Sequence, residues 1–159
     1  MKLFTRVVRA GLLCGVADGL FSSVLTLLYR RTVTRLFQGV AATAFGPSMF
    51  DGGLRTALLG LAMHFGVALT WSAIFLVLVM RSSRLRRVLD TRFGMLEASA
   101  VYGPGIWMVM SLGVIPLLSH QPVAITWRWW VQFFGHIAFV AMPIVWSIAP
   151  VRDQLATHP

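Results

Sequence analysis

The sequence has few charged residues, few acidic residues and one cysteine. Charged side chains make up 12% of its 159 residues and hydrophobic ones 57%, a composition far from that of a soluble domain. The single cysteine, Cys14, cannot form an internal disulfide. The sequence also contains no nucleophile paired with a base, no glycine-rich phosphate loop and no closely spaced metal ligands. It therefore indicates a membrane protein that is not an enzyme.

Long apolar runs occupy most of the chain and predict its fold. A helix needs about 20 apolar residues, at 1.5 Å each, to cross a hydrocarbon layer of about 30 Å. Four such runs lie at residues 7–29, 54–80, 93–118 and 129–148. Between the first two, apolar side chains recur with a helical period over residues 33–45. We expect an all-α protein with one transmembrane domain over residues 1–159: an integral membrane four-helix bundle plus an amphipathic helix. That helix lies in the membrane interface or packs as a cap over the bundle.

Basic residues lie at the ends of the apolar runs. The formal net charge is +9, but no basic patch stands apart from the spans, so we expect membrane topology and not nucleic-acid binding to explain it. Nine basic residues fall on the side of both termini and five on the other: Lys2, Arg6, Arg9, Arg81, Arg84, Arg86, Arg87, Arg92 and Arg152 against Arg30, Arg31, Arg35, Arg55 and Arg128. Because short cytoplasmic loops are enriched in Lys and Arg, both termini are predicted to be cytoplasmic.

Polar residues inside the spans are the candidate functional residues. A charge at the bilayer centre costs roughly 2.5–3.5 kcal/mol, so such a residue needs a partner or a task. At 1.5 Å per residue, Asp18, His64 and His136 lie about 16, 15 and 10 Å from the same membrane face. They are expected to meet inside the bundle, with Tyr102 as a further member of the cluster. Glu97 lies about 6 Å from the opposite end of its span and can reach the headgroups.

Several roles are open to this cluster. Two imidazoles on facing helices can ligate a b-type haem, and imidazole can also pass a proton. A transition metal has little support, because no paired-ligand motif accompanies Asp18. Alternatively, the histidines hold the bundle together through hydrogen bonds to side chains or to backbone carbonyls freed by prolines. The sequence favours this structural role, leaves haem or solute binding open and predicts no metal site.

Two further patterns concern packing and anchoring. In lipid, small residues at regular helical spacing allow close contact between helices, and such stripes contain Gly11, Gly15, Gly19 and, in the second span, Gly60. Tryptophan and arginine are typical of interfacial anchors, and they cluster before the fourth span at Trp127, Arg128, Trp129 and Trp130.

Part of the chain resembles a known family. The stretch LFQGVAATAFGPSMFDGGLRTALLGLAMHF, residues 36–65, resembles a family of small bacterial four-span inner-membrane proteins of unknown function, and VYGPGIWMVM and FGHIAFVAMP are similar to its third and fourth spans. A weaker similarity, around FGH, is to YagU-type inner-membrane proteins. The resemblance implies a bacterial inner-membrane location but no activity. It also implies that these positions belong to the pattern: Gly52, Gly53, Thr56, Gly60, His64, Tyr102, Gly103, Pro116, His136 and Pro143.

Two functions are compatible with these features. The leading hypothesis is an accessory or scaffolding subunit, bound to a larger membrane complex or to another copy of itself, because the chain has little mass outside the membrane. The alternative is a binding protein or carrier for a cofactor such as haem, a proton or a small apolar solute. It would use Asp18, His64, Tyr102 and His136.

Overall fold

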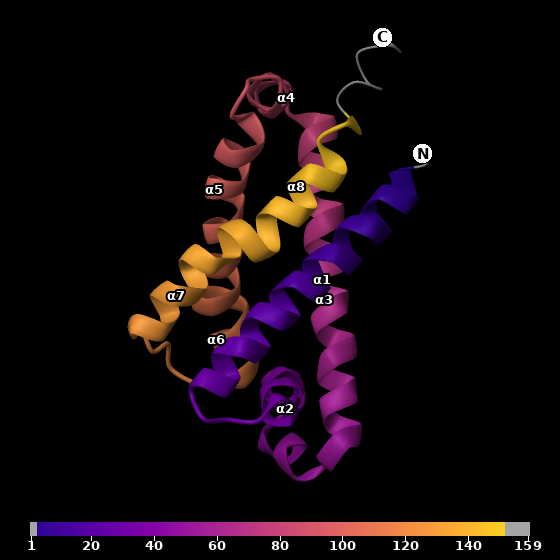
Figure 1. Ribbon diagram of the computed structural model, residues 1–159. Coiled ribbons are helices and arrows are strands. Elements are labelled where there is room, and N and C mark those ends of the chain that lie inside the picture. The colour runs from indigo at the N-terminus through magenta and orange to yellow at the C-terminus, as the bar shows by residue number, and fades with distance from the viewer. Residues whose placement is uncertain (1–2, 152–159) are drawn as a thin grey trace.

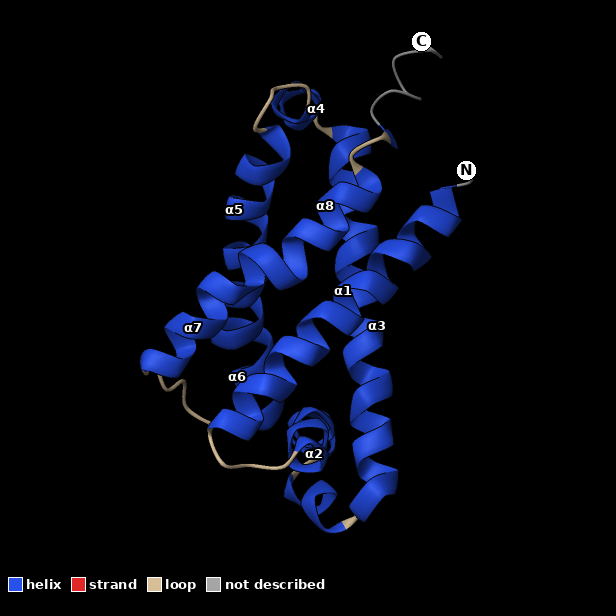
Figure 2. Ribbon diagram, in the orientation of Figure 1, coloured by secondary structure: helices blue, strands red, loops and turns tan. Residues whose placement is uncertain are grey.

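The computed structural model describes residues 3–151, which form helices and connecting loops without a strand (Figures 1 and 2). Four helical stretches are long and apolar enough to cross a membrane: α1 (Leu3–Leu28), α3 (Gly53–Arg81), Gly94–Ser119 and Trp127–Ile148. They match the four predicted spans with ends shifted by a few residues. The prediction of an all-α, membrane-type four-helix fold is therefore confirmed.

The third and fourth spans are not continuous α-helices. The third consists of α5 (Gly94–Met108), a π-helical segment (Val109–Val114) and α6 (Ile115–Ser119). The fourth consists of α7 (Trp127–His136), a π-helical segment (Ile137–Ala141) and α8 (Met142–Ile148). Each π-helical segment is followed by a proline within two residues, Pro116 or Pro143. Because proline has no N–H to donate to the preceding turn, it favours a local departure from α-helical bonding.

Two short helices connect the first three spans. The amphipathic segment forms α2 (Val33–Phe45), as its period predicts, and a 3₁₀ turn (Pro47–Asp51) leads from it into α3. Thr32 caps α2 by accepting a hydrogen bond from the N–H of Arg35 at 3.3 Å. At the other end of α3, Ser82 caps α4 (Ser83–Leu89) in the same way, from the N–H of Leu85 at 3.1 Å. Figure 1 shows α2 nearly end-on, across the ends of the spans.

The two ends of the bundle differ in packing. The end that carries α4 also holds the start of α1 and the end of α8 (Figure 1), and the predicted basic residues Lys2 and Arg152 lie outside the described residues. The largest fully buried side chains include Phe75, Leu89, Ile144 and Ile148, which belong to the elements that meet there. The α2 end instead contains the cavity described below. The bundle is thus solid at one end and hollow at the other.

Glycines allow the closest approaches between helices. A Cβ on Gly11 or Gly15 of α1 would collide with Leu69 or Phe65 of α3. A Cβ on Gly60 would lie 2.7 Å from the carbonyl carbon of Phe37 in α2. These three glycines, taken from the predicted stripes, therefore serve contacts within the chain.

The fourth stripe glycine, Gly19, behaves differently. A Cβ there would lie 3.5 Å from His64 Nε2, an ordinary contact, and Gly19 lines the cavity. At 3.6 residues per turn, a four-residue repeat rotates by about 40° at each step, which carries Gly19 away from the face that Gly11 presents to α3.

Candidate functional site

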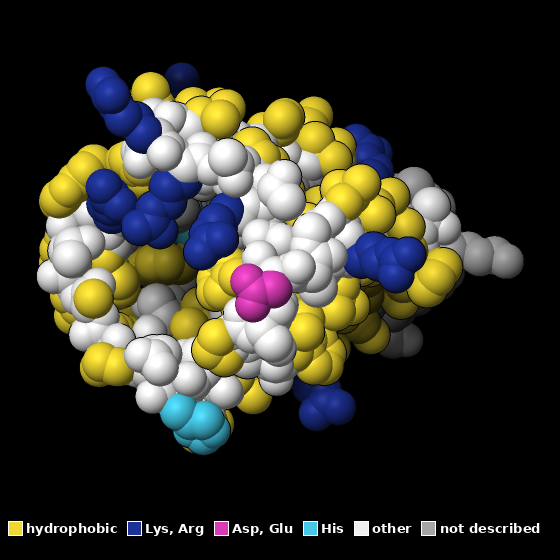
Figure 3. Space-filling model, turned by 90° about the horizontal axis from the view of Figure 1, so that it is seen from below, with side chains coloured by type: hydrophobic (Ala, Val, Ile, Leu, Met, Phe, Trp, Pro, Cys, Tyr) yellow, Lys and Arg dark blue, Asp and Glu magenta, His cyan; other side chains and the backbone are white. Residues whose placement is uncertain are grey.

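A cavity of about 360 Å³ lies between the α1–α3 pair and the α5–α7 pair, with α2 at its outer end. Its lining is mainly apolar and aromatic: Phe37, Met63, Trp71, Trp107 and Met110 are among the residues that form it. The face that carries α2 is hollowed, and basic side chains gather along one edge of the hollow (Figure 3). The volume is within the range of about 300–1,000 Å³ typical of small-molecule sites.

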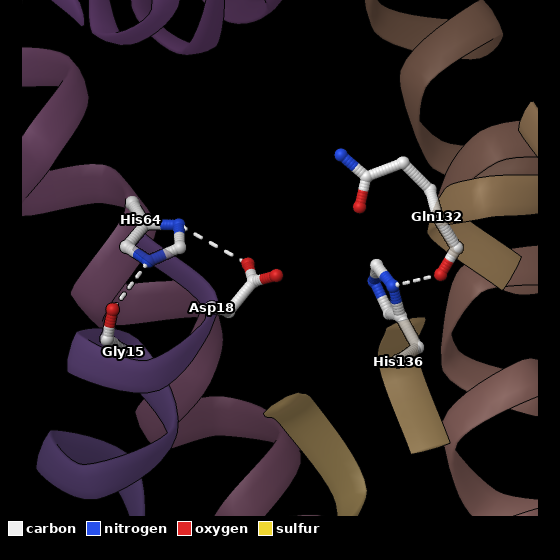
Figure 4. Close-up of polar contacts among 5 residues, drawn as sticks. All are labelled: Gly15, Asp18, His64, Gln132 and His136. Carbon is white, nitrogen blue, oxygen red and sulfur yellow. Dashed lines mark hydrogen bonds and ion pairs between the residues drawn. The ribbon is translucent and has the colours of Figure 1, made fainter. Parts of the chain in front are cut away.

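Asp18 and His64 form one polar wall of this cavity. His64 Nε2 lies 2.9 Å from the carbonyl oxygen of Gly15, and His64 Nδ1 lies 3.9 Å from Asp18 Oδ2 (Figure 4). Because a carbonyl can only accept, Nε2 carries a hydrogen, and Nδ1 is the nitrogen that faces the carboxyl group. At 3.9 Å the carboxyl group and Nδ1 are near neighbours but too far apart for a direct hydrogen bond.

His136 and Gln132 lie on the opposite side of the cavity (Figure 4). His136 Nδ1 donates to the backbone carbonyl of Gln132 at 2.7 Å, so Nε2 carries the lone pair. In the described part of the chain, Nε2 has no hydrogen-bond partner. The imidazole packs beside the Trp107 ring, with 4.9 Å between ring centroids. His136 thus has an acceptor nitrogen available to a ligand.

Three buried polar atoms on cavity-lining residues lack hydrogen-bond partners: Asp18 Oδ1, Gln132 Oε1 and Trp107 Nε1. Figure 4 shows the free carboxylate oxygen of Asp18 directed away from His64, toward the side of His136. A buried polar atom without a partner costs about 1–3 kcal/mol. Such atoms around one cavity are the arrangement expected where a polar group of a bound molecule supplies the missing partner.

Tyr102 and Glu97, the other polar residues of the third span, do not line the cavity. The Tyr102 hydroxyl donates to the backbone carbonyl of Trp71 at 2.6 Å. Its ring packs against Phe75, with 4.9 Å between centroids. Tyr102 therefore joins α5 to α3 beside the site, and Glu97 is exposed on the outside of α5.

The expected interfacial anchor is divided in two. Trp127 and Trp130 are exposed, whereas Trp129 is 9% exposed and its Nε1 donates to Ser111 Oγ at 3.0 Å. For Trp129 the prediction is corrected: this ring packs inside the bundle and joins α7 to the third span. The guanidinium of Arg128 lies 4.1 Å from the centroid of the Tyr29 ring, at the end of α1.

Gln132, Trp107 and the α2 side chains are site residues that the sequence analysis did not propose. Gln132 precedes His136 by four residues, so the two share a helix face, and that spacing was an available signal. The contribution of α2 has no such signal, because it depends on how α2 lies across the spans.

The donor set does not suit haem in this arrangement. Both ring nitrogens of His64 already face protein groups, the Gly15 carbonyl and the Asp18 carboxyl. An axial pair with His136 would require His64 to give up one of these contacts. Within residues 3–151, no three His, Cys, Asp or Glu side chains are grouped so as to hold a metal ion.

These features define a class of protein: a membrane protein of four apolar helices with a cavity inside the bundle. Comparison with known proteins adds no family, since no family model, curated protein or solved structure matches the chain.

Proposed function

We propose that this protein binds a small, mainly apolar molecule in the cavity, as a membrane binding protein or carrier that does not chemically convert it. The observation that carries the proposal is the cavity itself: about 360 Å³, apolar and aromatic over most of its wall, with Asp18, His64, Gln132 and His136 among its polar groups. Buried polar groups left without partners favour a binding role over a purely structural one.

The free groups indicate what kind of molecule fits. Asp18 Oδ1 accepts hydrogen bonds when the carboxyl is ionised, and His136 Nε2 accepts in the tautomer that its Gln132 contact selects. The matching ligand therefore has an apolar body and a hydrogen-bond-donating head, such as a hydroxyl or an amine. The aromatic rings of Phe37, Trp71 and Trp107 contact the apolar body.

Quenching of tryptophan fluorescence by a brominated medium-chain alcohol tests this proposal in lipid nanodiscs, because Trp71 and Trp107 line the cavity. We expect a saturable component that the matched brominated alkane does not produce. Val40→Phe narrows the cavity and should remove that component. Val101→Phe adds the same side chain at a position that is 76% exposed on α5 and should retain it. If quenching rose in proportion to the added alcohol in the unchanged protein and in both variants, the alcohol would only be partitioning into lipid. That result would refute the proposal.

An accessory or scaffolding role is a second proposal. Its support is the broad apolar exterior, which includes Val101, Leu117 and Trp146. Three glycines of the predicted packing stripes, Gly11, Gly15 and Gly60, already contact helices of the same chain, so this role has less support than binding. Native membranes solubilised in mild detergent distinguish the two: a defined larger complex supports the accessory role, and a lone monomer in every detergent removes its basis.

We also propose that the chain belongs to the four-span family that its sequence resembles and resides in a bacterial inner membrane with both termini in the cytoplasm. The support for the family and the location is the resemblance over residues 36–65, and the support for the orientation is the basic-residue asymmetry, nine against five. Reporter fusions at the C-terminus test the orientation, and activity only outside the cytoplasm would reverse it.

A further inference from the structure

The turn that ends α1 places an arginine where glycine is usual. The N–H of Arg31 bonds to the carbonyl of Thr26 at 3.0 Å, and that of Arg30 bonds to Leu27 at 2.9 Å. These are the two hydrogen bonds of a Schellman motif, whose left-handed position favours glycine. Here Arg30 occupies it, with φ at +56°. Arginine adopts this backbone conformation at a cost that glycine would avoid.

Arg30 lines a second pocket, outside the bundle at its α2 end. The pocket has a volume of about 510 Å³ and lies between the end of α1 and the start of α7. Its walls are Leu25, Leu28, Tyr29, Arg30, Trp127, Arg128 and Val131. It therefore combines two guanidinium groups with an apolar strip formed by residues of two spans.

Within residues 3–151, no carboxylate balances the two positive charges of this pocket. No acidic side chain lines it. Among the described residues, no ion pair joins Arg30 or Arg128 to a carboxylate. Arg128 is held over the Tyr29 ring, and the Tyr29 hydroxyl is buried without a hydrogen-bond partner. An anion with several acceptor oxygens matches these donors.

We propose that this pocket binds the phosphate headgroup of an anionic membrane lipid. Arg30 and Arg128 bind the phosphate, a phosphate oxygen supplies an acceptor for Tyr29, and an acyl chain lies along Leu25, Leu28 and Val131. The site lies where two spans end, which is the depth of lipid headgroups. Two unpaired arginines attract a headgroup with net negative charge and repel the ammonium of a zwitterionic one. The proposal is independent of what the cavity binds.

Native mass spectrometry of the whole protein, released from nanodiscs of mixed phosphatidylglycerol and phosphatidylcholine, tests the site by counting retained lipids. The test variant combines Arg30→Gly and Arg128→Gln. The control combines Arg31→Gln and Arg55→Gln, which removes the same charge from the same end of the bundle but outside the pocket. We expect the ratio of retained phosphatidylglycerol to phosphatidylcholine to fall about 30-fold in the test variant and to change little in the control.

The choice of glycine separates lipid binding from folding. Glycine suits the left-handed position of Arg30, so Arg30→Gly alone should melt at the same temperature as the natural chain or higher while its phosphatidylglycerol retention falls. If the test and control variants lost phosphatidylglycerol equally, overall charge alone would explain the retention. That result would refute the site. Displacement of the lipid by soluble glycerol phosphate would make the site one for free phosphate esters and would also refute a lipid site.

Discussion

Replacing Gly60 with alanine should push α2 away from α3 and destabilise the fold. The added Cβ would lie 2.7 Å from the carbonyl carbon of Phe37 and 3.2 Å from the amide nitrogen of Ala41. Ordinary contacts begin at 3.4 Å, and both neighbours are backbone atoms that cannot rotate away. The carbonyl oxygen of Phe37 lies closer still, so the whole of α2 must move away from α3, which also moves Phe37 and the outer end of the cavity.

A matched substitution on the same helix gives the magnitude. Overpacking of this kind costs about 1–3 kcal/mol. A Cβ at Gly66 of α3 would meet nothing within 4 Å, so Gly66→Ala should gain about 0.5–1 kcal/mol from helix propensity. Gly60→Ala has the same propensity gain, so the two variants, identical in composition, should differ by the overpacking cost of about 1–3 kcal/mol.

Reversible unfolding in mixed detergent micelles, followed by circular dichroism, measures this difference. Binding of the brominated alcohol to the folded variants adds a functional readout, and we expect it to weaken only in Gly60→Ala. If Gly60→Ala were as stable as Gly66→Ala, α2 would not pack tightly against Gly60. The inferred position of α2 at the cavity would then be refuted as well.

Two further substitutions test the polar contacts. His64→Leu removes the hydrogen bond to Gly15 and the partner of Asp18; it should lower the free energy of unfolding by roughly 0.6–2 kcal/mol and abolish saturable alcohol quenching in protein that still inserts. Unchanged quenching would leave His64 with a structural role alone. Tyr102→Phe removes the 2.6 Å bond to Trp71 and should destabilise by a similar amount without loss of binding, so a loss of binding in a stable Tyr102→Phe protein would place Tyr102 in the site after all.

The spans and α2 were predictable because each depends on the pattern of its own segment. Long apolar runs require membrane-spanning helices, and a repeat of apolar residues requires a helix with one buried face. The meeting of Asp18 and His64 was also within reach, since depth in the membrane follows from residue number. Each of these inferences needs only the geometry of a single helix.

The cavity was not predictable from such patterns. It exists because α1, α2, α3 and the third and fourth spans leave space that their side chains do not fill, and that space depends on crossing angles. Trp129 shows a different limit: composition suggested an anchor, but Trp129, Gln132 and His136 are spaced three and four residues apart and share one face. Rotation about the α7 axis, and not residue type, decides that Trp129 lies inside while Trp127 and Trp130 lie outside.

The π-helical segment at Ile137–Ala141 determines how the chain tolerates insertions and deletions. A π-helical turn accommodates an extra residue within an α-helix, and this one lies between His136 in the cavity and Ile144 in the packed core. Deleting one residue there would restore α-helical bonding while His136 and Ile144 keep their faces, because the wide turn already absorbs the extra residue. A deletion in the regular part of α7 or α8 would instead rotate everything beyond it by about 100°. A related sequence one residue shorter at this point could therefore keep both the packed end of the bundle and the hollow one, whereas a length change elsewhere in the fourth span would cost one of them.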